Sequence, residues 1–287
     1  MSEALIRPGR MPSTAPTRKR RRWSVAKILS LVILAIGALG MMAPFVYMLV
    51  TSLKSSANAY DLPPTWIPTE FEWGNYQRAL TDQVPLLLNM LNSAVIAIAS
   101  TLGLLITAPM AGYAFARLKF RGSSVMFITL LASLMVPIQV TIIPLWLIMR
   151  NLGLINSPLS LILPAVTGAF GVFLMRQFFL TVPTEILEAA KIDGANAWKT
   201  YSLIALPLVK HGLSTLGVIT FLASWNAYFA PSIFLNSIQS ATLPLGLVLM
   251  LGPYGTGQIN VIVPAFLVYL VAQRWIISSL TQSAVKG

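Results

Sequence analysis

The longest polar connection in the chain, from Gln177 to Lys210, holds the side chains whose types and spacing could support chemistry. It contains Glu185, Glu188 and Asp193, three of the eight acidic residues. The chain has no cysteine and one histidine, so thiolate chemistry and a histidine-based metal cluster are excluded. No pairing of a nucleophile with a base is present either, which argues against a membrane enzyme. The acidic groups of this connection are therefore suited to docking.

Residues 183–193 have the pattern of a short surface helix. Pro183 suits a helix start, and Glu185 complements the positive end of the helix dipole. Four residues then recur at i, i+3, i+4 and i+7, namely Ile186, Ala189, Ala190 and Asp193. We predict a helix with one face of small residues that is available to a cytosolic partner. An amphipathic connector with no partner is the simpler alternative.

A sharp turn and a second short helix are expected next. Gly194 can adopt the left-handed conformation that ends a helix, and Asn196 can cap the following helix. The nearest approach to a phosphate-binding loop lies at residues 194–200, but Trp198 stands where the second glycine would be needed. We therefore expect no cofactor on this chain, and any energy from nucleotide hydrolysis would have to come from a separate subunit.

The elements that position this connection are apolar. The chain is 56% hydrophobic and 10% charged, whereas soluble domains carry about a quarter charged residues. Since hydrocarbon offers the backbone no hydrogen-bond partners, spans of this length have to be helices. The fold class predicted is an all-α integral membrane protein with six transmembrane helices, at 28–52, 91–115, 124–148, 157–178, 212–234 and 260–280.

The distribution of basic residues predicts the orientation. With the N-terminus inside, inner segments hold 17 of the 20 Lys and Arg residues, so both termini are expected in the cytoplasm. Residues 1–27 are interpreted as a disordered basic cytoplasmic tail and residues 28–287 as the six-helix transmembrane domain. A role of the tail in binding RNA or anionic lipid is an alternative to a topology anchor.

The spans contain few polar groups and no charged residue in their cores. This disfavours a proton- or sodium-driven carrier and favours a neutral polar solute. Small residues four apart, at Ala108, Gly112 and Ala116, predict one face on which a second helix can approach closely. Candidate solute contacts are Asn92, Gln139, Thr141, Trp225, Asn226 and Tyr228, although residues of these types more often form hydrogen bonds between helices or interfacial anchors.

The 177–210 connection also resembles a known family. The runs Glu188-Ala189-Ala190, Asp193-Gly194-Ala195 and Leu206-Pro207-Leu208, with Ile204, look like the EAA loop of ABC importer permeases. Further segments are similar to maltose-type carbohydrate permeases: 173–179, 224–228, 242–246, 272–275 and 284–287. The resemblance implies a type I ABC importer permease with a coupling loop at 183–207, between the fourth and fifth spans.

The resemblance also implies partners and site residues. The partners would be a second homologous permease, two ATPase subunits that bind ATP and Mg, an extracytoplasmic solute-binding protein and membrane lipid, but no nucleic acid. Contacts with the binding protein would come from Tyr254, Gly255 and Thr256. Docking to the ATPase would involve Glu188, Ala189, Ala190, Asp193, Gly194, Lys286 and Gly287.

These inferences lead to one expected function and one alternative. We expect a non-catalytic, multi-pass permease subunit of an ATP-driven carbohydrate importer in the bacterial cytoplasmic membrane. The alternative is an ABC permease for another solute, such as glycerol phosphate or a polyamine.

Overall fold

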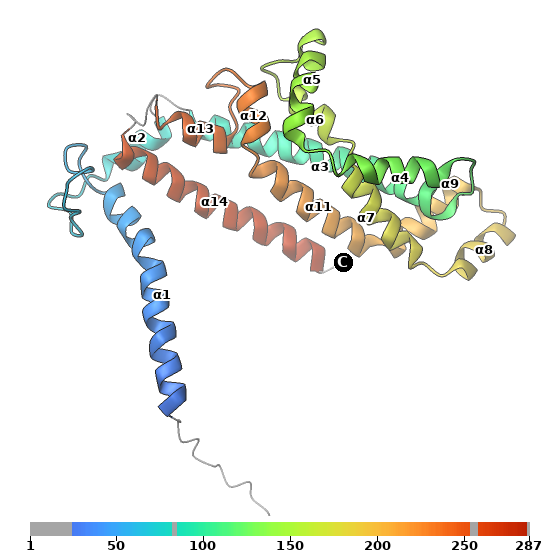
Figure 1. Cartoon of the computed structure of the whole chain (residues 1–287), viewed down its shortest axis with the longest axis horizontal. Helices are drawn as coiled ribbons and strands as arrows, with labels where there is room; N and C mark the ends of the chain where they lie inside the picture. Colours follow the sequence, from blue (N-terminus) through green and yellow to red (C-terminus); the bar gives the residue numbers. More distant parts are fainter. Residues whose placement is uncertain (1–24, 82–84, 253–257, 286–287) are drawn as a thin grey trace, which may run out of the picture. The chain divides into compact units, whose positions relative to one another are not determined.

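The structure, a computed structural model, describes residues 25–81, 85–252 and 258–285, and these residues form helices and loops without any strand. The chain divides into two units, Met1–Tyr47 and Met48–Gly287. Figure 1 labels most of the helices. Their bounds are α1 (Val25–Ser52), α2 (Gly74–Thr81), α3 (Leu86–Arg117), α4 (Ser123–Ser133), α5 (Ile138–Asn151), α6 (Leu159–Ala165), α7 (Ala169–Leu180), α8 (Thr184–Ile192), α9 (Ala197–Lys199), the π-helical η1 (Thr200–Ala205), α10 (Leu206–Leu208), α11 (Lys210–Trp225), α12 (Phe229–Phe234), α13 (Leu243–Leu249) and α14 (Ile259–Val285).

The expected all-helical fold is confirmed, whereas the count of six spans stays a prediction. Within the described residues, three helices are long and apolar enough to cross a membrane: Leu29–Ser52, Leu86–Arg117 and Leu159–Leu180. Two bent pairs of helices pass the same test together, which raises the count to as many as five. The described apolar part of α14, Ile259–Val271, is shorter than a full span.

The span expected at 124–148 is not one continuous helix. It is divided into α4 and α5, which meet at an angle of 101°. Pro137 lies at the break with an extended backbone, at φ −64° and ψ 139°. Proline lacks the N–H that would continue a helix and disfavours helical geometry at the preceding residue. The third expected span is therefore broken at Pro137, although the hydrophobic sequence continues through this residue.

The fifth expected span, 212–234, is also interrupted. Its first part is α11, which ends at Trp225, and its last part is α12, which begins at Phe229. A second bend precedes it, because residues 197–208 make an angle of 75° with α11. Pro207 lies next to this bend and removes one backbone donor from the helix. The connection from α8 thus reaches α11 through a corner.

Helix α3 is the centre of the second unit, where it packs against α6, α7, α11 and α13 (Figure 1). The expected close approach on its small-residue face is observed with α7. A Cβ atom added at Gly112 would lie 2.8 Å from Met175 Cβ and 2.9 Å from the backbone nitrogen of Arg176. A Cβ at Gly171 would lie 3.0 Å from Ala108 Cβ. Glycine and alanine are therefore required for these two helices to pack at this distance.

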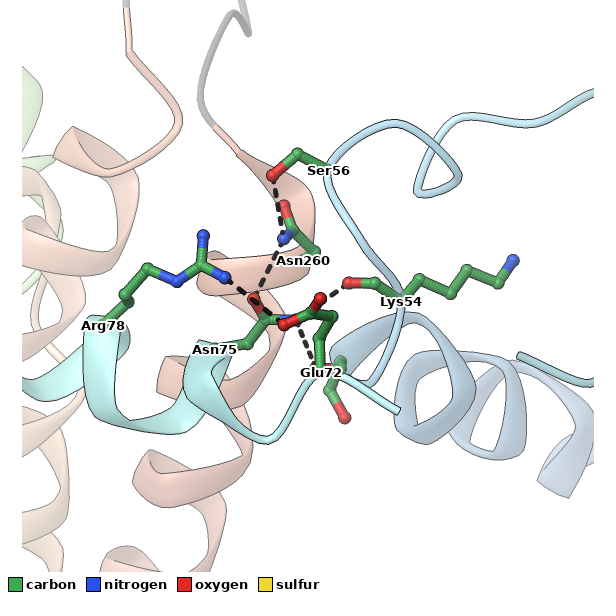
Figure 2. Close-up of polar contacts among 7 residues, drawn as sticks. Lys54, Ser56, Glu72, Asn75, Arg78 and Asn260 are labelled. Atoms are coloured by element: carbon green, nitrogen blue, oxygen red, sulfur yellow. Dashed lines mark hydrogen bonds and ion pairs between the residues drawn. The ribbon is translucent and has the colours of Figure 1, made fainter. Parts of the chain in front are cut away.

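A buried polar network joins residues 52–56, α2 and the start of α14 (Figure 2). Asn75 is fully buried, and its side-chain nitrogen donates to the carbonyl oxygens of Ser52 (3.0 Å) and Lys54 (2.8 Å). Asn260 is also buried and donates to Asn75 Oδ1 (3.1 Å) and Ser56 Oγ (3.2 Å). These bonds satisfy backbone groups that no helix satisfies, so the loop after residue 52 is held against two helices.

The packing at Gly112 generates a stability prediction. Replacing Gly112 by Ala forces the backbones of α3 and α7 apart, because the new methyl group meets backbone atoms as well as a side chain. Overpacking of this kind costs about 1–3 kcal/mol. The thermal unfolding midpoint of the purified protein should therefore fall. The matched control is Gly217→Ala on α11, where the methyl group would lie 3.5 Å from Leu105 Cδ1, an ordinary contact, and should leave the midpoint unchanged or raised.

Candidate functional site

The candidate docking segment begins with α8 and a left-handed turn, as the sequence predicts. Pro183 precedes the first helical residue, and Glu185 lies in the first turn. At the other end Gly194 has φ 79°. The N–H of Gly194 donates to the carbonyl of Lys191 (3.0 Å), and that of Ala195 donates to the carbonyl of Ala190 (2.9 Å). This pair of bonds is the Schellman motif, which gives the helix a defined end.

The second helix of the connection starts at Asn196, whose side-chain oxygen accepts from the backbone nitrogen of Lys199 (2.8 Å). The expected cap is thus observed. The expected short α-helix differs, because residues 200–205 form the π-helical η1 before α10. π-Helical turns appear inside α-helices where a residue is accommodated without breaking the helix. Here the π segment lies between the turn at Gly194 and the corner before α11.

The faces of α8 differ from the expected grouping. The sequence pattern placed Ile186, Ala189, Ala190 and Asp193 on one face, but Ala190 is buried together with Leu187. Leu187 belongs to the core formed by α3, α7 and η1. The buried side of α8 therefore contains Leu187 and Ala190, and not the predicted group of four residues. The residues left exposed at i, i+3, i+4 and i+7 are Glu185, Glu188, Ala189 and Ile192. We call these four residues the exposed face of α8.

Aromatic side chains support the inner side of this segment. The ring of Tyr201 in η1 lies 5.3 Å from that of Tyr113 in α3 and 6.2 Å from that of Phe179 in α7. Tyr113 and Phe179 pack edge to face at 5.4 Å. Such pairs add to the stabilisation from apolar burial alone. The second helix of the connection is therefore attached to both α3 and α7.

Arg117 connects the end of α3 to the junction between α7 and α8. Its guanidinium donates to the backbone carbonyls of Phe179 (2.7 Å from Nη2), Leu180 (3.2 Å) and Val182. It also donates to Thr184 Oγ1 at 3.3 Å, in the first turn of α8. The last carbonyls of a helix have no partner within that helix, and a planar guanidinium with five donors can serve several of them together. Arg117 therefore holds the entry to α8 in place.

Comparison with known proteins identifies the family. Residues 99–281, more than half of the chain, match the family described as binding-protein-dependent transport system inner membrane component. The chain belongs to this family. It is accordingly a permease subunit of an ABC transport system. Helices α4 to α13, with the α8 connection, the larger part of α3 and most of α14, lie inside the matched range.

Individual relatives agree with this assignment. The permease is 32% identical over 266 residues to the sn-glycerol-3-phosphate transport system permease protein UgpE of Yersinia pestis bv. Antiqua (strain Antiqua), across 88% of this chain and 95% of the relative. It is 36% identical over 203 residues to the arabinooligosaccharides transport system permease protein AraQ of Halalkalibacterium halodurans, across 68% of this chain and 73% of the relative.

A solved structure has the same fold. It is a chain from a bacterial ABC transporter involved in the import of the acidic polysaccharide alginate, with a TM-score of 0.74 and 22% sequence identity. The alignment covers 90% of this chain and 96% of that chain. The helical arrangement is therefore that of a type I ABC importer permease.

The docking residues predicted from the sequence occupy different environments in the permease. Glu188, Ala189, Asp193 and Gly194 are exposed, whereas Ala190 is buried and cannot present its side chain to a partner without rearrangement. Lys286 and Gly287, and the predicted binding-protein contacts Tyr254, Gly255 and Thr256, lie outside the described residues. Docking through the exposed residues stays a prediction.

The six predicted solute contacts do not converge on one place. Asn92 donates to the carbonyls of Gln239 (2.8 Å) and Ala241 (3.1 Å). These bonds join two segments of the chain, which is the structural explanation that was the alternative to a solute contact. Trp225 is 1% exposed and stacks on Phe221 with a centroid distance of 5.9 Å. The remaining four are exposed: Gln139 and Thr141 on α5, Asn226, which accepts from the hydroxyl of Tyr269, and Tyr228.

None of these six residues lines the cavity of about 290 Å³ that lies among α3, α5, α6, α11 and α12. Their neighbours in the sequence do, including Ile138, Ser224 and Ala227. A solute role for the six stays a prediction.

Sequence reasoning missed Arg117. It lies in the inner segment 117–121, where it contributes to the charge bias that predicts orientation, and nothing in the sequence distinguishes it from Lys119 or Arg121. Its role follows from the position of the end of α7, which is determined only by helix packing. The tertiary structure is needed to find it.

The Arg117 contacts generate a local stability prediction. Arg117→Ala leaves the carbonyls at the end of α7 without these donors, which costs about 1–3 kcal/mol for each buried group that stays unpaired. Amide hydrogen exchange of residues 179–192, measured by mass spectrometry, should become faster. Arg121→Ala, at an exposed position near the same helix end, should leave that exchange unchanged. Equal exchange in both variants would contradict the role assigned to Arg117.

Proposed function

We propose that the permease forms half of the pathway of an ATP-driven carbohydrate importer and is driven through the exposed face of α8. The observation that carries this proposal is the combination of a rigid attachment and an open face in one short helix. Its buried side is joined to α3 and α7 through Leu187 and Arg117, and its other side presents Glu185, Glu188, Ala189 and Ile192. Ile192 is 86% exposed.

The exposed face has the composition of a docking surface. A large apolar side chain in full contact with solvent is unfavourable and is covered when a partner binds. Carboxylates beside it can accept hydrogen bonds or pair with basic groups of that partner. We propose that the partner is a separate ATPase subunit that binds ATP and Mg, and that two such subunits act with this permease and a second homologous one.

The transmission of movement follows from the contacts of α8. When the ATPase subunits close on ATP, a displaced α8 carries Arg117 and the aromatic group around Tyr201 with it. Both attachments lead into α3, which packs against α6, α7 and α11. A packed bundle changes between discrete arrangements and does not deform continuously. The result would be alternating access, with this permease subunit catalysing no reaction of its own.

The further parts of the proposal come from the sequence and the relatives. We propose that both termini and α8 lie on the cytoplasmic side, because of the basic residues in the inner segments. An extracytoplasmic binding protein would deliver the solute, with residues 254–256 as its contact. We propose that residues 28–287 form the transmembrane domain and that residues 1–27 form a cytoplasmic tail.

Carbohydrate is the solute class that we favour, since one relative is named for arabino-oligosaccharides and the cores of the spans lack charge. A glycerol phosphate is the second candidate, because the other relative is named for it. A phosphate ester would be expected to meet a cation. Arg176, the basic residue of α7, is already engaged, since its guanidinium carbon lies 4.2 Å from the ring centroid of Phe127 and its Nε donates to the carbonyl of Phe115 (3.3 Å).

The docking claim generates a first functional prediction. Glu188→Lys reverses the charge in the middle of the exposed face, which removes an acceptor for the basic groups of the partner and repels them. Solute-stimulated ATP hydrolysis of the assembled complex should fall about tenfold or more, which corresponds to a loss of about 1.4 kcal/mol of docking free energy. Gly194→Pro should have the same effect, because proline cannot adopt φ 79°.

Membrane insertion of these two variants should be normal. The control is Lys119→Glu, an exposed charge reversal near the same helix end but outside α8, which should leave the stimulation intact. Full stimulation in Glu188→Lys and Gly194→Pro would overturn the docking claim.

The solute claim generates a second prediction. Proteoliposomes that contain this permease with its partner permease, ATPase and binding protein should take up radiolabelled arabinobiose and not sn-glycerol 3-phosphate. The physical reason is that a charged solute in this uncharged pathway would be desolvated without compensation. Uptake of the phosphate ester alone would favour the second candidate.

A further inference from the structure

The cavity among α3, α5, α6, α11 and α12 has two features of a binding site, its volume and its unpartnered hydroxyl groups. Its volume of about 290 Å³ is near the lower end of the range for small-molecule sites. Two hydroxyl groups in its lining, Ser100 Oγ and Thr242 Oγ1, are buried and have no hydrogen-bond partner among the described residues. Ser100 is 0% and Thr242 is 2% exposed.

Buried hydroxyls without a partner are uncommon in proteins generally. Among the described residues four are found, and Ser100 and Thr242 are the two that line this cavity, whereas Thr51 and Thr101 lie outside its lining. A helical serine or threonine commonly donates to the carbonyl three or four residues earlier. Ser160, in the same lining, does so by donating to Ser157 at 2.7 Å, and Thr215 donates to His211 at 2.8 Å. Ser100 and Thr242 therefore retain hydrogen-bonding capacity, which a molecule in the cavity could use.

The position of Thr242 shows how its hydroxyl is left available. Thr242 directly precedes α13, where a threonine would ordinarily accept from the backbone of the first turn. No such bond is made here: Pro244, the second residue of α13, has no N–H, and the first N–H, that of Leu243, donates to Ser93 Oγ at 2.8 Å. Ser93 lies seven residues before Ser100, on the same face of α3. Ser93 Oγ thus accepts a hydrogen bond from α13, whereas Ser100 Oγ has no partner among the described residues.

The lining indicates the chemistry of the occupant. None of the described residues that line the cavity is charged, and its polar side chains are hydroxyls, with Thr220 and Ser224 beside those already named. The remaining lining is aliphatic, apart from Phe234. Hydroxyls can donate to and accept from the hydroxyls of a solute, whereas the apolar walls suit its C–H surfaces.

We propose that this cavity is a solute site within the permease, where a neutral hydroxylated solute bonds to Ser100 Oγ and Thr242 Oγ1. The inference rests on the proposed function and deepens it by naming where and how the solute is held in this chain. A small number of hydrogen bonds suits a transport site, which has to release its solute as readily as it takes it up.

The absence of cysteine from the natural chain allows a direct test. Ser100→Cys is prepared in the assembled complex in proteoliposomes and treated with neutral 2-hydroxyethyl methanethiosulfonate or anionic 2-sulfonatoethyl methanethiosulfonate, with and without ATP. Modification of this chain is followed by mass spectrometry. The neutral reagent should react about tenfold faster or more, because a charge is costly to place in an uncharged cavity. Ser93→Cys, outside the lining, is the matched control and should stay unmodified.

The reagent experiment can overturn the proposal without knowledge of the transported solute. If the Ser100→Cys thiol is unreactive in every state, lipid or the second permease fills the cavity, since a thiol buried in apolar surroundings stays protonated. Equal rates with both reagents would exclude a site selective for neutral compounds. Because this experiment needs no transport, failure of the wild type to take up arabinobiose would count against the proposed carbohydrate and not against the site.

A second measurement separates a solute contact from a structural role. The double variant Ser100→Ala and Thr242→Val removes both hydroxyls with little change in volume. Uptake of arabinobiose should fall about tenfold or more, because a lost hydrogen bond to the solute is not replaced, and the thermal unfolding midpoint should not fall. Ser93→Ala should show the reverse pattern. Undiminished uptake in the double variant, with the wild type active, would overturn the proposed contacts.

Discussion

Backbone carbonyls at the end of α7 need donors, and the Arg117 guanidinium supplies them from the end of α3. The last carbonyls of any helix have no partner within that helix, so this requirement is general. The consequence is mechanical. The same side chain that donates to the carbonyls of α7 also donates to Thr184 in α8, so α8 is joined by a hydrogen bond to the end of the central helix of the bundle.

The close packing of α3 and α7 makes this attachment possible. Gly112 and Gly171 allow the two backbones to approach, and Arg117 follows Gly112 by little more than one helical turn. Tyr113, one residue after that glycine, contacts Phe179 and Tyr201. Small residues, an aromatic group and a guanidinium thus act together along one face of α3, and each depends on the distance that the glycines set.

Helix breaks have a comparable role in the other part of the bundle. The break at Pro137 starts α5 in a new direction, and Ile138 and Ile142 of this helix line the cavity. The break between α11 and α12 likewise brings Ala227, Ala230 and Pro231 to the same wall. A cavity with hydroxyls but no charges among its described lining residues therefore lies where two interrupted spans and α6 meet α3.

The sequence by itself determined the helical class, because long uncharged runs can only be helices in a membrane. It also determined the turn at Gly194 and the cap at Asn196, since both depend on residues close together in the chain. Only the tertiary structure decided that Ala190 is buried and that Glu185, Glu188, Ala189 and Ile192 form the open face. It alone showed that Arg117, and not Lys119 or Arg121, donates to the carbonyls of α7, and that Ser93 accepts a hydrogen bond while Ser100 has no partner. Those distinctions depend on which groups of distant segments lie within hydrogen-bonding or packing distance, and periodicity along one helix carries no information about that.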